Sequence, residues 1–311
     1  MPLHPEVAKA LALMNTNIPP LHTLPPAESR KLMEEMRPPA DNPEPVAKVE
    51  NRMIPGAAGQ QPVRIYTPEG DGPFPILVYF HGGGWVIGSI DTVDASCRAL
   101  TNLAECIVIS ADYRLAPEHK FPAAADDCYA ATRWAALYAA ALRGDPTRIA
   151  VGGESAGSNL AASVALMAQE RGAPTIAYQL LLYPVIDYAF NTPSYQENAE
   201  GYFLTKDMMA WFWNQYLASE ADGQNPFASP IRAQDNRLAE VAPAFIAAAE
   251  FDPLRDEAAA YAAKLKEAGV AVEYKCYEGL IHGFMGMAPA VAPAKQAREE
   301  AAAALKAAFA R

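Results

Sequence analysis

The fold is decided by a short stretch of sequence, Ile149-Ala150-Val151-Gly152-Gly153-Glu154-Ser155-Ala156-Gly157. Its first residues have the apolar character of a buried strand, and the spacing of Leu160, Val164 and Met167 behind it is that of a core-facing helix. A serine between glycines at such a strand–turn–helix is typical of a nucleophile elbow, because small neighbours allow the tight turn. The stretch therefore predicts a nucleophilic Ser155 rather than a structural serine in a glycine-rich turn.

The same alternation of strand and helix continues on both sides of this stretch. Strand-like runs lie near Ala47–Met53, Val63–Thr67, Ile76–Phe80, Ile107–Ser110, Arg148–Gly152, Gln179–Tyr183, Ala244–Ala249 and Val272–Tyr277. Helical patterns lie at Val93–Leu103, Ala123–Leu142, Ser155–Gln169, Arg255–Ala268 and Lys295–Ala308. Such alternation predicts an α/β fold, with a mostly parallel sheet of about eight strands covered by helices on both faces.

Two segments interrupt this alternation, one at the N-terminus and one after the sixth predicted strand. The first is rich in proline and has short helical patterns at Pro5–Met14 and Ala27–Met36. The second contains the aromatic and Met-rich run Phe203–Trp213. We expect them to pack together as a helical cap over the sheet, with ordinary peripheral helices as the alternative. The predicted division is 1–45 and 188–225 for the cap, and 46–187 and 226–311 for the catalytic core.

A glycine-rich loop, His81-Gly82-Gly83-Gly84-Trp85, follows the third predicted strand. Glycines let the backbone approach a ligand closely and point successive N–H groups at one atom. In folds with a nucleophile elbow, this loop and the residue after the nucleophile supply the oxyanion-hole donors. The predicted donors are Gly83, Gly84 and Ala156, the alternative being a flexible turn. We expect His81 to shape this loop rather than to act as a base.

A serine hydroxyl needs a base to remove its proton, and that base needs an orienting carboxylate. Among the five histidines of the chain, His282 lies just after the last predicted strand and before the last helix. Asp252 follows directly on the preceding strand. The order Ser155, Asp252, His282 is the chain order that accompanies a nucleophile elbow. The rival acid is Asp256, inside the following helix.

Taken together, these motifs resemble those of the bacterial carboxylesterases of the hormone-sensitive lipase family, across essentially the whole chain. The matching residues are His81–Gly84, Asp112–Glu118 with Phe121–Ala123, Gly153–Gly157 with Asn159–Ala161, Asp252–Glu257, and Ile281–Phe284. The resemblance implies a capped α/β-hydrolase fold that hydrolyses esters of short to medium acyl chains without a cofactor. Glu154, where the family usually has Asp, and Ser158, where Gly is common, are departures that bear on fine specificity.

Other activities remain open on the same triad. An amidase or peptidase, a long-chain lipase, and a non-catalytic small-molecule-binding protein are the alternatives. The segment Asp112–Glu118 is interpreted as scaffold, with Arg114 forming ion pairs with Asp112 and Glu118.

A pocket for the acyl or alcohol group is predicted from large apolar side chains on the glycine-rich loop and in the second cap segment. Each of them has the alternative of merely packing against neighbouring helices. The predicted wall consists of Trp85, Met208, Met209, Trp211 and Phe212.

The composition limits the partners and the compartment. A net charge of −11 argues against nucleic acid or an anionic membrane surface as the main partner. The four cysteines form no C-x-x-C pair, and neither a signal peptide nor an apolar run of about 20 residues is visible. We expect a cytoplasmic enzyme with free thiols, a small-molecule ester substrate and neither metal nor cofactor; the oligomeric state is left open.

Overall fold

The computed structural model describes residues 2–17, 19–35 and 42–310, and its centre is one eight-stranded sheet. The strands lie side by side in the order β1-β2-β4-β3-β5-β6-β7-β8. The pairs β1–β2 and β2–β4 are antiparallel, and all the others are parallel. This topology confirms the predicted α/β class and the mostly parallel sheet. The strand bounds are β1 Lys48–Gly56, β2 Gly59–Thr67, β3 Phe74–Phe80, β4 Ile107–Ala111, β5 Gly144–Glu154, β6 Tyr178–Leu182, β7 Ala244–Phe251 and β8 Val272–Ile281.

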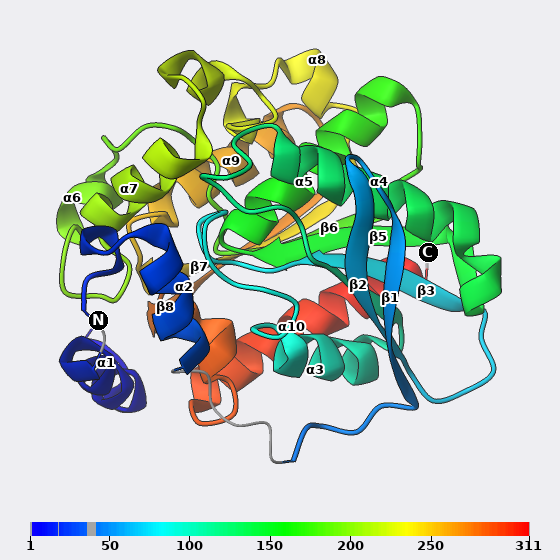
Figure 1. Cartoon of the computed structure of the whole chain (residues 1–311), viewed down its shortest axis with the longest axis horizontal. Helices are drawn as coiled ribbons and strands as arrows, with labels where there is room; N and C mark the ends of the chain where they lie inside the picture. The colour runs from blue at the N-terminus through cyan, green and yellow to red at the C-terminus, as the bar shows by residue number, and fades with distance from the viewer. Residues whose placement is uncertain (1, 18, 36–41, 311) are drawn as a thin grey trace.

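Helices cover both faces of this sheet (Figure 1). The α-helices are α1 Pro5–Asn17, α2 Pro26–Glu35, α3 Asp94–Ala104, α4 Ala123–Tyr138, α5 Ala156–Arg171, α6 Pro193–Glu197, α7 Lys206–Tyr216, α8 Asp235–Leu238, α9 Arg255–Glu267 and α10 Ala292–Phe309. Short 3-10 helices are η1 Leu21–Thr23, η2 Ala140–Leu142, η3 Glu220–Gln224, η4 Pro230–Arg232 and η5 Phe284–Met287. In Figure 1, α3 and α10 lie on one face of the sheet, α4, α5 and α9 lie on the other, and α1, α2, α6 and α7 lie together at one side.

The strand β3 shows why the sequences of the central strands are unbroken apolar runs. All seven of its residues are buried. Ile76, Val78 and Phe80 belong to the core that includes α4, α5 and α9, whereas Leu77 and Tyr79 belong to the core with α3 and α10. Successive side chains of a strand point to opposite faces, and both faces here are covered. Fully burying each large apolar side chain contributes about 1.5–3 kcal/mol, so the centre of the sheet is strongly fixed.

Most predicted helices end within a few residues of their expected bounds, with three differences. The predicted helix Ala123–Leu142 is divided into α4 and η2, and the backbone then turns through Arg143, whose φ is 59°. The short helices α6 and α8 had no predicted counterpart. The last residue of the pattern Ala27–Met36 lies outside the described residues.

The ion pairs predicted for Arg114 are wrong. Arg114 makes a bidentate contact with Asp127 of α4, with Nε–Oδ2 and Nη2–Oδ1 distances of 2.7 and 2.9 Å. Glu118 pairs instead with Arg30 of α2, and a carboxylate oxygen of Asp112 lies 4.0 Å from Nε2 of His81. The prediction considered only residues close in sequence, whereas α4 and α2 bring more buried partners from outside the segment.

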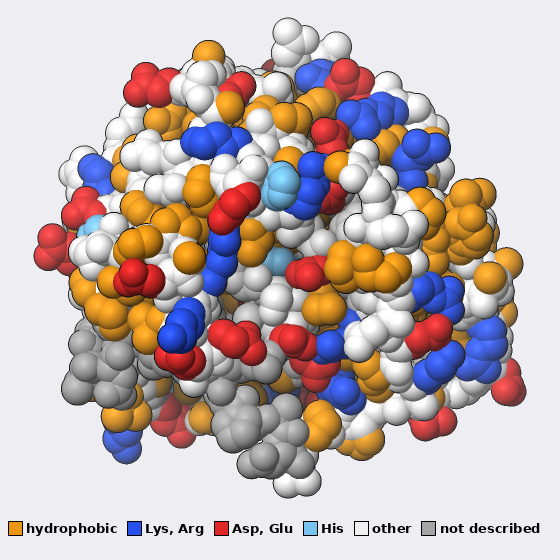
Figure 2. Space-filling model, viewed as in Figure 1, with side chains coloured by type: hydrophobic (Ala, Val, Ile, Leu, Met, Phe, Trp, Pro, Cys, Tyr) orange, Lys and Arg blue, Asp and Glu red, His pale blue; other side chains and the backbone are white. Residues whose placement is uncertain are grey.

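The surface mixes both signs of charge. On the face drawn in Figure 2, lysine and arginine side chains are interspersed with aspartate and glutamate. Within the described ranges, no helix has the length and apolar character needed to cross a membrane.

Candidate active site

Ser155 occupies a sharp turn between the end of β5 and the start of α5, with φ 55° and ψ −121°. The turn brings the backbone of the glycines on either side close to β3. A Cβ added to Gly157 would lie 2.0 Å from the carbonyl oxygen of Phe80, and one on Gly153 would lie 2.5 Å from the same atom. Only glycine fits at either position, which explains the spacing of the motif.

Three side chains meet at the carboxyl ends of β5, β7 and β8. The Ser155 Oγ lies 2.9 Å from Nε2 of His282, and the His282 Nδ1 lies 2.7 Å from Oδ2 of Asp252. A carboxylate only accepts hydrogen bonds, so Nδ1 carries the proton and Nε2 is left to accept from the serine hydroxyl. Ser155 is 9% exposed, His282 6% and Asp252 1%. This linear, nearly dry arrangement is the geometry of an activated serine nucleophile.

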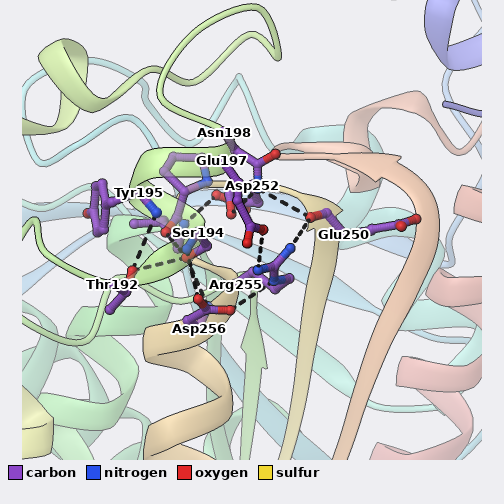
Figure 3. Close-up of polar contacts among 11 residues, drawn as sticks. Thr192, Ser194, Tyr195, Glu197, Asn198, Glu250, Asp252, Arg255 and Asp256 are labelled. Carbon is purple, nitrogen blue, oxygen red and sulfur yellow. Dashed lines mark hydrogen bonds and ion pairs between the residues drawn. The ribbon is translucent and has the colours of Figure 1, made fainter. Parts of the chain in front are cut away.

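The second oxygen of Asp252 is also satisfied. Its Oδ1 accepts from the backbone N–H of Leu254 at 2.9 Å, which leaves Oδ2 directed at the imidazole. The backbone carbonyl of Asp252 accepts from the side-chain amide of Asn198 at 3.2 Å (Figure 3). The first contact holds the carboxylate beside the base, and the second holds the backbone of the same residue.

The rival acid Asp256 is engaged elsewhere. Its carboxylate accepts from the backbone N–H of Ser194 at 2.7 Å and from Nε of Arg255 at 2.8 Å (Figure 3). Arg255 also pairs with Glu197 of α6, so this cluster joins α6 to α9. The structure brings Asp252, and not Asp256, to His282.

The glycine-rich loop faces Ser155 across the same edge of the sheet. Gly83 and Gly84 have φ values of 108° and 58°, and a Cβ on Gly84 would lie 2.1 Å from the ring of Phe212 in α7. Among the described residues, neither N–H group donates to another backbone group. Together with the Ala156 N–H at the start of α5, they are free donors of the kind an oxyanion requires.

A cavity of about 240 Å³ opens above Ser155. Three of the five predicted wall residues line it, namely Met208, Met209 and Phe212. The remaining lining residues are Leu21, Met33, Gly82, Gly83, Gly84, Ile87, Gly88, Thr92, Glu154, Ser155, Tyr183, Phe203, Leu204, His282 and Gly283. Its volume lies below the roughly 300–1,000 Å³ of pockets for drug-sized ligands, which suits a small substrate.

Two predicted wall residues lie outside this lining. Trp85 is fully buried and stacks on Tyr216, with ring centroids 4.2 Å apart. Trp211 is half-buried and packs edge-on against Phe212. Both side chains therefore pack against neighbouring aromatic rings and do not line the cavity.

Comparison with known proteins places this site in a family. Residues 77–286 match the family described as alpha/beta hydrolase fold. The chain belongs to this family.

Several relatives of this α/β-hydrolase carry esterase names. It is 47% identical over 240 residues to the carboxylic ester hydrolase LipN of Mycobacterium tuberculosis, a match that covers 75% of this chain and 63% of that protein. It is 38% identical to the ethyl acetate hydrolase of Pseudomonas putida, covering 92% of this chain and 93% of the other. A thermostable esterase from Pseudomonas putida superposes with a TM-score of 0.95 at 36% identity, covering 99% and 98% of the two chains.

Two other ionisable side chains of this α/β-hydrolase, His81 and Glu154, lie near the glycine-rich loop, and burial shifts the pKa of each. Burial lowers the pKa of His81 to about 4, against a smaller effect of the Gly82 carbonyl, and its ring stacks on Tyr113 at 4.2 Å. A neutral, stacked imidazole agrees with the predicted shaping role. Burial raises the pKa of the Glu154 carboxyl, and the hydroxyl of Tyr183 opposes that effect. Within the described ranges no cluster of histidine, cysteine, aspartate and glutamate could hold a metal ion.

Sequence reasoning missed several lining residues of the cavity. Leu21 and Met33 come from the N-terminal segment, and Phe203 and Leu204 immediately precede α7. Tyr183 follows β6 with a φ of 40°. No local sequence pattern predicted that Leu21 or Met33 would line the cavity. The aromatic run that begins at Phe203 could have predicted that Phe203 and Leu204 do.

Proposed function

We propose that this chain hydrolyses carboxylic esters of short to medium acyl chains through an acyl-enzyme on Ser155. It is a carboxylic ester hydrolase, in keeping with the names of its relatives. The observation that carries the proposal is the continuous Ser155–His282–Asp252 contact at the floor of a small, mainly apolar cavity.

In the acylation step, Nε2 of His282 takes the proton of the Ser155 hydroxyl while Oγ attacks the ester carbonyl carbon. Asp252 holds the imidazole tautomer and stabilises the positive charge that forms on it. His282 then returns the proton to the leaving alcohol. In the second step His282 takes a proton from a water molecule, whose oxygen attacks the acyl carbon. The bond from Oγ to the acyl group then breaks, His282 returns the proton to Oγ, and the acid is released.

The negative charge on the carbonyl oxygen develops opposite the backbone donors. We assign this oxyanion hole to the N–H groups of Gly83, Gly84 and Ala156. Each such donor contributes about 3–4 kcal/mol to the transition state, because it is fixed in advance and excluded from water. Neither glycine N–H donates to another backbone group among the described residues, so both are available for this purpose.

We also assign residues 1–45 and 188–225 to a cap over the core formed by 46–187 and 226–311. The support is that both segments reach the same cavity: Leu21 and Met33 from the first, and Phe203–Phe212 from the second. Contacts between α7 and η1 join the two segments. Such a cap sets the size of the substrate.

A cytoplasmic location remains part of the proposal. It is supported by four cysteines that stay free, of which Cys97, Cys106 and Cys128 are buried and Cys276 is exposed. The net charge of −11 supports a small-molecule substrate over nucleic acid. Cell fractionation with a thiol-accessibility assay tests the location; a secreted or disulfide-bonded form contradicts it.

The triad is tested by substitution. Ser155→Ala and His282→Ala should each lower kcat by a factor on the order of 10⁶, and Asp252→Asn by about 10⁴, with the fold intact by circular dichroism. Asp256→Asn is the matched control, since it removes the same charge four residues away, and should have a mild effect. The assignment of the acid is wrong if Asp256→Asn is the damaging change. A panel of esters and matching amides separates an esterase from an amidase.

A further inference from the structure

Glu154, the residue before the nucleophile, has a carboxylate held by three donors from three parts of the chain. Its Oε2 accepts from the hydroxyls of Tyr79 in β3 at 3.4 Å and Tyr183 after β6 at 3.2 Å. The backbone N–H of Gly82 donates to the same carboxylate. Gly82 also packs directly on Glu154, since a Cβ added to Gly82 would lie 3.3 Å from Cγ and 3.5 Å from Oε1 of that side chain. Glu154 is also the acidic side chain in the lining of the cavity.

The three donors connect this carboxylate to both halves of the catalytic machinery. Gly82 directly precedes Gly83 and Gly84, so its N–H anchors the start of the oxyanion loop. The ring of Tyr183 lies edge-on against the ring of His282, with centroids 4.8 Å apart and an interplanar angle of 64°. One side chain therefore fixes the loop that binds the oxyanion and the aromatic ring that borders the base.

We propose that Glu154 is a positioning residue of the hydrolysis: its carboxylate holds the oxyanion loop and Tyr183, and its charge stabilises the His282 imidazolium. This inference rests on the proposed function. Asp252 and Glu154 then act on the imidazole together, the first by direct contact and the second by charge. A negative charge near a forming cation favours that cation, and the dry site strengthens the effect.

No lysine or arginine is among the ionisable side chains found to interact with Glu154 in the described part of the chain. The ionisable side chains that interact with it are Tyr79 of β3, Cys97 of α3, Tyr113 after β4, Tyr183 after β6 and His282 after β8. Each of these except His282 is neutral or anionic across its titration, so His282 is the group on which the charge of Glu154 acts. Burial raises the pKa of the carboxyl, and the donated hydrogen bonds oppose that effect.

The test is the pH profile of kcat/KM for Glu154→Gln, which keeps the shape of the side chain and removes its charge. We expect kcat to fall about tenfold with KM nearly unchanged, and the acid limb of the profile to move down by about 0.5 pH unit. The matched control is Glu273→Gln, which removes the same charge from an exposed residue near the start of β8. Glu273 pairs with Phe245 near the start of β7, so it lies at the opposite end of the strands from Ser155. This variant should leave both quantities unchanged.

Glu154→Asp separates charge from reach. It keeps the charge but is one methylene shorter, so we expect a loss of kcat with the acid limb unmoved. Any of three results overturns the inference: the acid limb of Glu154→Gln stays where it is in the wild type, the acid limb of Glu154→Asp moves down as far as that of Glu154→Gln, or Glu154→Asp keeps the kcat of the wild type. The last measurement applies even if Glu154→Gln does not fold. Failure of the proposed function is distinct, since it requires an inactive wild type or an active Ser155→Ala enzyme.

Discussion

At the scale of single residues, the site depends on backbone conformations that side chains ordinarily avoid. Ser155 has a φ of 55°, which costs on the order of 1–3 kcal/mol, and the turn that contains it leaves no room for a side chain at Gly157, where a Cβ would lie 2.0 Å from the Phe80 carbonyl oxygen. Gly84 is constrained in the same way by Phe212. These positions are fixed by packing, so small changes at them should alter catalysis more than folding.

Gly84→Ala is therefore expected to disable the oxyanion loop. Its Cβ would lie 2.1 Å from the Phe212 ring, at a φ of 58°, so the loop must shift and at least one donor leaves its place. Loss of one such donor lowers kcat by about 10²–10³. Gly286→Ala is the control, because no atom lies within 4 Å of its added Cβ. The measurement is steady-state kinetics of both variants on one short ester. A near-normal kcat in Gly84→Ala contradicts the assignment of the Gly84 N–H to the oxyanion hole.

The residues that sequence analysis could place are those that follow strands directly. Asp252 and His282 come immediately after β7 and β8, and parallel strands bring their carboxyl ends to one edge. Trp85 and Trp211 were assigned to the wall because they are large and apolar, but the direction of a side chain on a loop or helix depends on tertiary packing. The place of Leu21 in the cavity wall could not be predicted, because it too depends on tertiary packing.

At the scale of elements, one arginine joins α2 to the core. Arg30 donates from Nε to the Val86 carbonyl and from Nη2 to the Ala116 carbonyl, both at 2.7 Å. It also forms a two-fold contact with Glu118, at 2.9 and 2.7 Å. The carbonyl of Trp85 in turn accepts from Ala116, so α2 is tied to the loop beside the oxyanion donors.

Glu118→Gln should weaken this attachment in a pH-dependent way. The hydrogen bond from Arg30 lowers the pKa of Glu118 from 4.5 to about 2. A depressed folded-state pKa means that the stabilisation is present above about pH 4.5 and lost as the pH falls toward 2. The Glu118 side chain is 53% exposed, so its loss should lower the free energy of unfolding by at most about 1 kcal/mol at pH 7.

The measurement is urea unfolding of Glu118→Gln and the wild type at pH 7 and below pH 3. Lys31→Ala is the control, since Lys31 is adjacent to Arg30 but its side chain is 77% exposed and pairs within its own helix. A difference between wild type and Glu118→Gln that persists or grows at the lower pH contradicts the role given to the ion pair.

The same scale shows what local sequence could and could not predict. Every strand of the sheet was predicted, because apolar runs between turn residues are a local signal. The partners of Arg114 and Glu118 were not, since Asp127 and Arg30 reach them from other elements. Element type follows from local pattern, whereas ion-pair partners follow from how elements pack.

At the scale of the whole molecule, the cavity exists only because distant segments meet. Leu21 and Met33 precede the first strand, and Met208 and Met209 lie on α7, yet all four border the space above Ser155. Figure 1 shows α2 and α7 at the same side of the molecule. The depth of this space, and hence the substrate length, is a property of the assembled chain and was beyond prediction from local pattern.

A cavity of about 240 Å³, which can hold only part of a long acyl chain, predicts an optimum in acyl length. Each methylene that enters should contribute up to about 0.8 kcal/mol, or roughly fourfold in kcat/KM, until the space is full. Longer chains then stay in water or force the cap open, so the rate should fall after short to medium lengths. Met209→Ala should move the optimum to longer chains, whereas Trp211→Ala, on the same helix but outside the lining, should leave it in place. The assay is p-nitrophenyl esters from acetate to palmitate; a maximum at palmitate, or strong activation by emulsified triglyceride, indicates a long-chain lipase instead.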